Sequence, residues 1–151
     1  MTIFLDSSPL SLLAQPKKLS ETIGITQWAL TMMAAGHIFI VPAVADYEVR
    51  RELKRAGKTK SIASLDAWNS GRPNRFLPLT QAAMELASTL WAQARNNGTP
   101  TADPKELDGD VLIAAQALDM GLDPDQFVIA TVNVGHLALF VPAEHWTKIN
   151  P

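Results

Sequence analysis

The sequence contains no cysteine. A disulfide framework, a thiolate metal site, a cysteine nucleophile and thiol redox chemistry are therefore excluded, and an intracellular protein is favoured. No apolar run reaches the roughly 18 residues that a transmembrane helix needs. The N-terminus MTIFLDSSPL has no basic segment ahead of its apolar residues. We therefore expect a cytoplasmic protein without a membrane partner.

An excess of positive charge is also lacking. The 13 basic residues are outnumbered by 15 acidic ones, which gives a net charge of −2 and no global field that attracts nucleic acid. Basic residues gather only in residues 50–60, which we interpret as a solvent-exposed helix face. Glycine-rich phosphate loops, G-x-S-x-G and H-E-x-x-H are absent, so nucleotide-binding, serine-hydrolase and zincin classes lack support. We interpret the scattered histidines as structural: His37, His136 and His145.

What the sequence does contain is a regular alternation of short apolar runs and longer helical patterns. Hydrophobic residues make up 47% of 151 residues, enough for one domain spanning residues 1–151. The alternation predicts an α/β fold with a parallel sheet covered by helices on both faces. The expected strands are 2–5, 37–41, 75–79, 127–131 and 138–141, and the expected helices begin near Ser8 and span 20–35, 43–57, 59–69, 80–97 and 108–120.

Three polar residues lie at or just beyond the predicted strand ends, where parallel sheets bind ligands. They are Asp6, Thr131 and Asn133. Ser8 is expected to cap the first helix, with Pro9 in the first turn, which leaves Asp6 without a structural role. The alternatives are that Asp6 prepares the helix start and that Asn133 is a turn residue.

Helical geometry sorts the acids of residues 43–57 by the face on which they lie. Glu48 borders the apolar stripe and Glu52 falls inside it, so both are expected to lean inward. Asp46 lies off the stripe, and most of the basic residues occupy the far side. An inward carboxylate needs compensation, which a metal ion can provide. The alternative for both glutamates is an ion pair with the arginine three residues later.

The same reasoning applies to residues 108–120, where Gln116 and Asp119 are taken to mark the polar face. Asp108 joins that face, whereas Asp110 falls on the apolar face with Ile113. Asp110 is therefore the inward candidate. The alternatives are that Asp110 interacts with the helix dipole in the first turn and that Asp108 is an N-cap.

Together these residues resemble the motifs of the PIN-domain ribonucleases, which include the VapC-like toxins of toxin–antitoxin pairs. Asp6 in FLDSSPL resembles the first acid of that family, and Glu48 in VADYEVRREL resembles the second. Asp110 in DVLIAAQAL resembles the third, within a D-x-x-I-A-A pattern. Thr131 and Asn133 in ATVNVGHLALF resemble the closing T-x-N/D element.

The resemblance implies a Rossmann-like three-layer α/β/α sandwich with about five parallel strands. It also implies Mg²⁺ or Mn²⁺ bound by Asp6, Glu48 and Asp110, with Asn133 in the catalytic set, and hydrolysis of RNA. We expect supporting roles for Thr131, Ser8 and Asp108, and Glu52 is left open. An antitoxin protein and a second copy of the chain, as a homodimer, are the expected protein partners.

RNA contacts are expected from Arg72 and Arg75, near a predicted loop. Trp68 lies beside that loop and is the tryptophan best placed to stack on a base, whereas the others are expected to pack internally. The neutral Asn133 departs from an all-acidic set. One alternative is a non-catalytic PIN-fold module that binds RNA or protein. A phosphoacceptor receiver domain would need a second acid near the first strand, which is not evident.

Overall fold

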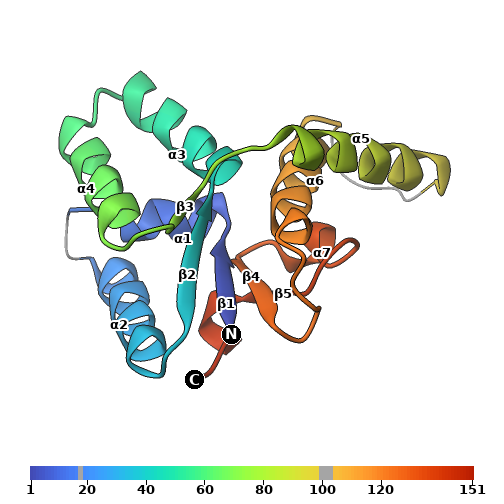
Figure 1. The fold of residues 1–151 in the computed structure, drawn as a ribbon. Coiled ribbons are helices and arrows are strands. Elements are labelled where there is room, and N and C mark those ends of the chain that lie inside the picture. The colour runs from blue at the N-terminus through green and yellow to red at the C-terminus, as the bar shows by residue number, and fades with distance from the viewer. Residues whose placement is uncertain (17–18, 99–103) are drawn as a thin grey trace.

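A parallel sheet of five strands forms the centre of the molecule (Figure 1). A computed structural model describes residues 1–16, 19–98 and 104–151. The strand order is β3-β2-β1-β4-β5, and all four pairings between these neighbouring strands are parallel. The strands are β1 (Thr2–Leu5), β2 (Ile38–Pro42), β3 (Phe76–Leu77), β4 (Phe127–Thr131) and β5 (Ala143–His145).

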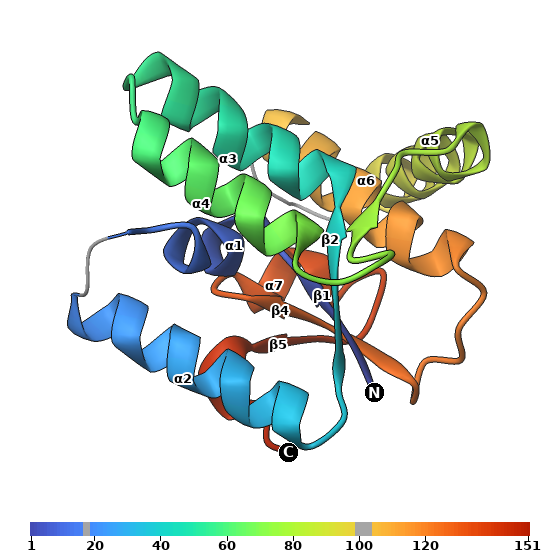
Figure 2. The ribbon, with the colours of Figure 1, turned by 60° about the vertical axis from the view of Figure 1, so that its left-hand side comes forward.

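Helices cover both faces of this sheet, which confirms the expected three-layer α/β/α sandwich. Figure 1 shows α2 and α4 on one side of the strands and α5 and α6 on the other. Figure 2 shows α3 and α4 side by side, in agreement with their packing. The helices are α1 (Ser7–Leu13), α2 (Ser20–Ala34), α3 (Ala43–Arg55), α4 (Thr59–Ser70), α5 (Gln81–Asn96), α6 (Pro104–Asp119) and α7 (Val134–Leu137), and Trp146–Lys148 form a 3₁₀ turn. Among the described residues no helix is long and apolar enough to span a bilayer.

The central strand β1 is buried by its neighbours and by both helical layers. Ile3, Phe4 and Leu5 have no exposed surface, as expected of a strand buried on both faces. The ring of Phe4 meets that of Phe127 on β4 edge to face, with centroids 5.6 Å apart. Leu5 pairs with Ala130, so the residues that follow each of them emerge at the same edge of the sheet.

Two helix starts differ from the prediction. The first helix is capped by Asp6 and not by Ser8, because an Asp6 carboxylate oxygen accepts a hydrogen bond from the backbone N–H of Ser7. The helix that carries Asp110 begins at Pro104, so Asp108 lies inside it and is not an N-cap. The position of Asp110 within α6 likewise removes it from the first turn.

The predicted strand 138–141 is wrong. The segment turns helically instead, with Ala138 N–H bonded to the Val134 carbonyl at 2.9 Å and Val141 N–H bonded to the Leu137 carbonyl at 3.1 Å. Leu137 is fully buried by this turn, and the last strand forms later, at Ala143–His145. A short apolar run fits the residue period of a helix and that of a strand equally well, and the packing of Leu137 in the core favours the helical turn.

Candidate metal centre

Asp6 is held at the carboxyl end of β1 by two neighbouring segments. Its side chain is buried, and its Oδ2 accepts a hydrogen bond of 2.6 Å from the hydroxyl of Thr131. Its Oδ1 accepts a bond of 2.7 Å from the Ser7 N–H at the start of α1. The Thr131 hydroxyl in turn accepts from the backbone N–H of Asn133 at 3.0 Å. The carboxylate is therefore fixed in direction while both of its oxygens lie at the sheet edge.

Glu48 approaches this edge from α3 and lies against the backbone of α6. A Cβ placed on Gly109 would come within 3.2 Å of Glu48 Oε1, so only glycine leaves ordinary room for the carboxylate. Burial raises the pKa of Glu48, the negative charge of Asp6 raises it further, and the charge of Arg51 partly offsets this. Two acids from distant parts of the sequence therefore sense each other electrostatically.

Asp110 joins the group from α6, one residue after Gly109. Its Oδ2 lies 3.4 Å from Nδ1 of His136, and its side chain is 19% exposed. The same histidine nitrogen lies 3.5 Å from Nδ2 of Asn133. Short contacts thus run from Asp6 through Thr131 to Asn133, and from Asn133 through His136 to Asp110. Glu48 is tied to this group by the effect of the Asp6 charge on its pKa and lies beside Gly109, the residue before Asp110.

The face assignment of α3 was correct for Glu48 but wrong for two other acids. Asp46, expected to face outward, is 7% exposed and accepts hydrogen bonds from Arg50 and from Asn69 of α4. Glu52, expected to lean inward, is exposed and forms the alternative ion pair with Arg55 at 2.8 Å. The reason is that α3 packs against α1, α4 and α6, so more than one of its faces is buried.

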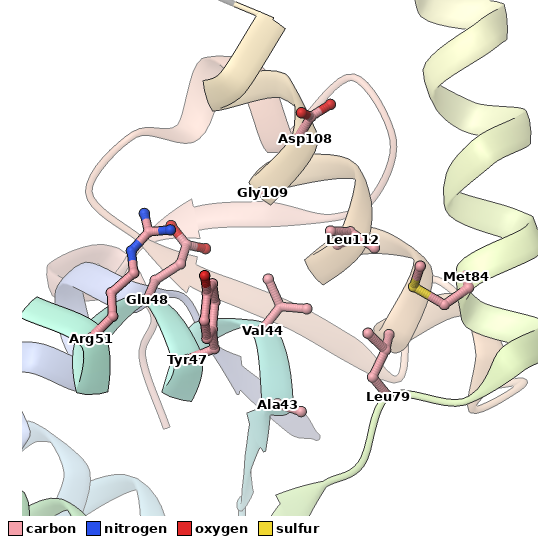
Figure 3. A pocket seen from close by; sticks show the side chains of 10 residues that line it. All are labelled: Ala43, Val44, Tyr47, Glu48, Arg51, Leu79, Met84, Asp108, Gly109 and Leu112. Carbon is pink, nitrogen blue, oxygen red and sulfur yellow. The ribbon is translucent and has the colours of Figure 1, made fainter.

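Gln116 was also misassigned, since it does not mark a polar face of α6. It is 1% exposed, accepts a hydrogen bond of 3.1 Å from Val44 N–H at the start of α3, and donates one of 3.0 Å to the Leu77 carbonyl of β3. Its amide therefore ties α6 to the helix that carries Glu48. Asp108 is exposed, and Figure 3 shows its carboxylate pointing away from Glu48, which speaks against the expected supporting role.

An open hollow of about 630 Å³ lies beside Glu48 (Figure 3). Its apolar lining includes Tyr47, Leu79 and Met84, residues that are 60%, 38% and 47% exposed. Arg51 lies at its rim, with its guanidinium 5.2 Å from the centroid of the Tyr47 ring. Arg51 is the arginine three residues after Glu48, and its charge partly offsets the rise in the pKa of Glu48. Ser8 lines a second hollow, of about 270 Å³, together with Glu48.

The two arginines expected to contact RNA differ in exposure. Arg72 is exposed, whereas Arg75 is 6% exposed. The guanidinium of Arg75 donates to the Trp68 carbonyl at 2.8 Å and lies 4.2 Å from the centroid of the Trp68 ring. Burial lowers the pKa of Arg75, and the nearby charge of Arg72 adds to this. The position of Arg75 therefore speaks against a phosphate contact, and Trp68 packs on Arg75 and Phe39 instead of offering a free face.

The donor set suits a hard divalent cation, although the side chains are not drawn together around one. Within the described ranges, no three His, Cys, Asp or Glu side chains already stand in a metal-binding arrangement. The oxygens of Asp6, Glu48 and Asp110 are nevertheless the ligand type that Mg²⁺ and Mn²⁺ prefer. Burial, and then the negative charge of Asp6, raise the pKa of Glu48, and a cation bound beside Glu48 would oppose this rise. In this respect the residues fit a cation.

Solved structures with the same architecture extend over nearly the whole chain. A chain in the crystal structure of VapBC2 from Rickettsia felis, bound to a DNA fragment from its promoter, superposes with a TM-score of 0.70 at 14% identity and covers 97% of this chain and 99% of its own. The protein has a PIN-like fold. A chain of FitAcB from Neisseria gonorrhoeae superposes with a TM-score of 0.67 at 20% sequence identity and covers 97% of this chain and 99% of its own. A chain of VapBC-1 from nontypeable Haemophilus influenzae superposes with a TM-score of 0.62 at 15% sequence identity and covers 98% of this chain and 100% of its own.

No protein-family model and no curated protein sequence matches the chain. At these identities the structural likeness establishes the PIN-like fold alone. Two residues of the site were missed from the sequence: Gly109, and His136, which was interpreted as structural. Gly109 could have been noticed because it directly precedes Asp110, whereas no local pattern marks His136.

Proposed function

We propose that this protein is a divalent-metal-dependent ribonuclease that hydrolyses phosphodiester bonds in RNA. The observation that carries the proposal is the convergence of Asp6, Glu48 and Asp110 at one edge of the sheet, from three elements far apart in the sequence. Such an edge is where α/β sheets bind their ligands. Its chemistry, carboxylate oxygens without a nucleophilic cysteine, suits hydrolysis by activated water.

Asp6, Glu48 and Asp110 would hold Mg²⁺ or Mn²⁺. When bound, the ion supplies Lewis-acid activation of water and stabilisation of the charge on the leaving oxygen. Thr131 fixes the direction of the Asp6 carboxylate by its hydrogen bond of 2.6 Å. Gly109 leaves room for Glu48 next to α6, and Gln116 ties α6 to the start of α3. These contacts position the ligands, and the side-chain Nδ2 of Asn133 lies 3.5 Å from Nδ1 of His136, next to Asp110.

A toxin role is the finer part of this proposal. The solved structures of like fold are of VapBC and FitAB assemblies, two of them with DNA fragments. We extend that arrangement to this chain and propose an antitoxin protein as its partner. The exposed apolar side chains beside Glu48, among them Tyr47 and Met84, offer a surface for a protein to cover.

If the chain is a toxin, its expression alone arrests growth, and the Asp110→Asn variant relieves the arrest. A homodimer stays a prediction, which sedimentation of the isolated chain tests.

The decisive experiment is a cleavage assay on a pool of single-stranded and structured RNAs with added Mg²⁺ or Mn²⁺. We expect Asp6→Asn and Asp110→Asn to lower the rate at least about 100-fold, since each removes a charged ligand of the ion. Asp123→Asn is the matched control, because Asp123 is exposed and precedes β4 at the opposite end of the strands. Equal rates for the wild type and the Asp6 and Asp110 variants would contradict a ribonuclease site.

The alternative, a non-catalytic module that keeps the fold, is favoured by one observation, the neutral Asn133 in place of a fourth acid. It predicts RNA binding without cleavage, and binding that persists when EDTA removes divalent ions. A filter-binding measurement with and without EDTA, run on the RNA pool of the cleavage assay, separates the two.

A further inference from the structure

His136 lies within reach of the acidic site, although its sequence surroundings do not mark it. The ring Nδ1 is 3.4 Å from Oδ2 of Asp110 and 3.5 Å from Nδ2 of Asn133. The His136 side chain is 25% exposed, so it is neither buried in the core nor free in solvent. Its nitrogen points at the carboxylate that the proposed function assigns to the metal ion.

The place of His136 is set by the segment that follows β4. Thr131 is the last residue of β4 and lies next to Asp6. Asn133 directly precedes α7, and His136 lies on α7. Helix α7 packs against α6, which brings His136 to Asp110. One short segment thus delivers three polar side chains to the site: Thr131 contacts Asp6, His136 contacts Asp110, and Asn133 lies beside His136.

The separation of the two donor atoms suits a shared cation. Two ligand atoms bound at right angles to an ion at about 2.1 Å lie about 3 Å apart. Nδ1 of His136 and Oδ2 of Asp110 are 3.4 Å apart, so a small adjustment would let one ion accept both. A neutral imidazole offers a lone pair at Nδ1 when its proton is on Nε2.

We propose that His136 supplies a nitrogen ligand to the divalent ion held by Asp110 and makes the site prefer Mn²⁺ to Mg²⁺. The inference rests on the proposed metal site and deepens it by naming the ion. Mg²⁺ keeps oxygen ligands and gives up water reluctantly, whereas first-row transition ions accept imidazole readily. Carboxylates suit both Mg²⁺ and Mn²⁺, so a ligand set without the imidazole would separate the two ions less.

The test measures metal binding directly, without RNA. Isothermal titration gives the dissociation constants for Mn²⁺ and Mg²⁺ of the wild type, His136→Ala and His136→Asp. We expect His136→Ala to weaken Mn²⁺ binding about tenfold or more and Mg²⁺ binding less than about threefold, so that the preference falls. His136→Asp replaces the nitrogen with oxygen donors and should shift the preference further toward Mg²⁺. His37→Ala, which removes an imidazole at the amino end of β2, should leave both constants unchanged.

A spectroscopic measurement distinguishes ligation from mere proximity. Pulsed electron paramagnetic resonance of bound Mn²⁺ detects the nitrogen-14 coupling of a directly bound imidazole. We expect this coupling in the wild type and in His37→Ala and its loss in His136→Ala. Circular dichroism of each variant confirms that it is folded, which is expected because His136 is partly exposed.

The outcomes separate this inference from the proposed function. The role of His136 is overturned if the wild type binds both ions and His136→Ala leaves the preference between them unchanged. It is also overturned if bound Mn²⁺ shows no nitrogen coupling. In either case the carboxylate site remains. Wild-type protein that binds neither ion overturns the metal site itself, and the His136 ligand with it.

Discussion

The hydroxyl of Thr131 donates a 2.6 Å hydrogen bond to Oδ2 of Asp6, although 125 positions separate the two residues. The parallel pairing of Leu5 with Ala130 makes this contact possible, because it carries both strands to the same level at the sheet edge. Thr131 is fully buried and Asp6 nearly so. A buried bond to an ionised carboxylate is stronger than one between neutral groups.

Replacing Thr131 with valine should destabilise the protein and loosen the site. The variant keeps the shape of the side chain but leaves Asp6 without one of its donors, so we expect a loss of about 1.5–3 kcal/mol in the free energy of unfolding. Urea denaturation monitored by circular dichroism measures it. Thr131→Ser keeps the hydroxyl and should retain most of the stability. If valine and serine variants unfold at the same urea concentration, the bond to Asp6 contributes nothing.

Replacing Gly109 with alanine should separate stability from activity. Glycine inside a helix costs up to about 1 kcal/mol relative to alanine, so the variant should unfold no more easily than the wild type. Its Cβ, however, would lie 3.2 Å from Glu48 Oε1 and displace the carboxylate. We expect weaker metal binding, about tenfold by titration, for a shifted ligand. Gly24→Ala is the control, since a Cβ there makes only an ordinary contact, 3.7 Å from Trp146.

Glu48→Gln should make the protein more stable at neutral pH in the absence of divalent ions. Burial, and then the charge of Asp6, raise the pKa of Glu48 above 4.5, so the folded state binds more protons here than the unfolded state. The free energy of unfolding therefore falls as the pH rises from about 4.5 through the raised pKa. The neutral variant removes this fall. Urea titrations of both proteins from pH 4 to 8 with EDTA test it, and a difference that does not change with pH would refute the sign.

Gln116→Leu should be costly because it leaves two backbone groups without partners. The N–H of Val44 loses its acceptor, Gln116 Oε1, and the carbonyl of Leu77 loses its donor, Gln116 Nε2. We expect a loss of about 1–3 kcal/mol for each group that stays buried and unsatisfied. Thermal and urea unfolding measure it. Gln93→Leu, on the exposed surface of α5, is the matched control and should change the free energy of unfolding by less than about 0.5 kcal/mol.

Arg72 and Arg75 should respond differently to alanine substitution. Arg72→Ala removes an exposed charge, so we expect weaker RNA binding that is also less sensitive to salt, without a change in stability. Arg75→Ala removes a buried guanidinium that contacts the Trp68 carbonyl and ring, so we expect it to lower the midpoint of unfolding. Filter binding over a range of salt concentrations, together with thermal unfolding, separates the effects. If the Arg75→Ala protein is folded and binds RNA less well, the RNA contact that the sequence predicted for Arg75 would be supported.

Much of the fold followed from local pattern alone. Residues 127–131 are apolar and β-branched between polar turns, and they form β4 with those bounds. Helix α5 begins after Thr80, whose hydroxyl accepts from Ala83 N–H as a cap should. The run after Asn133 could not be assigned, because a short apolar stretch satisfies the periods of helix and strand equally.

The sequence by itself placed Asp6 at a strand end and, through helical periodicity, turned Glu48 and Asp110 inward, and so named these three acids as candidates. Only the tertiary structure decided which side chains meet. Helical periodicity locates a residue relative to the apolar stripe of its own helix, but α3 is covered by three other helices, so Asp46 is buried and Glu52 is exposed. The contact of His136 with Asp110 depends on the packing of α7 against α6, which no local pattern encodes.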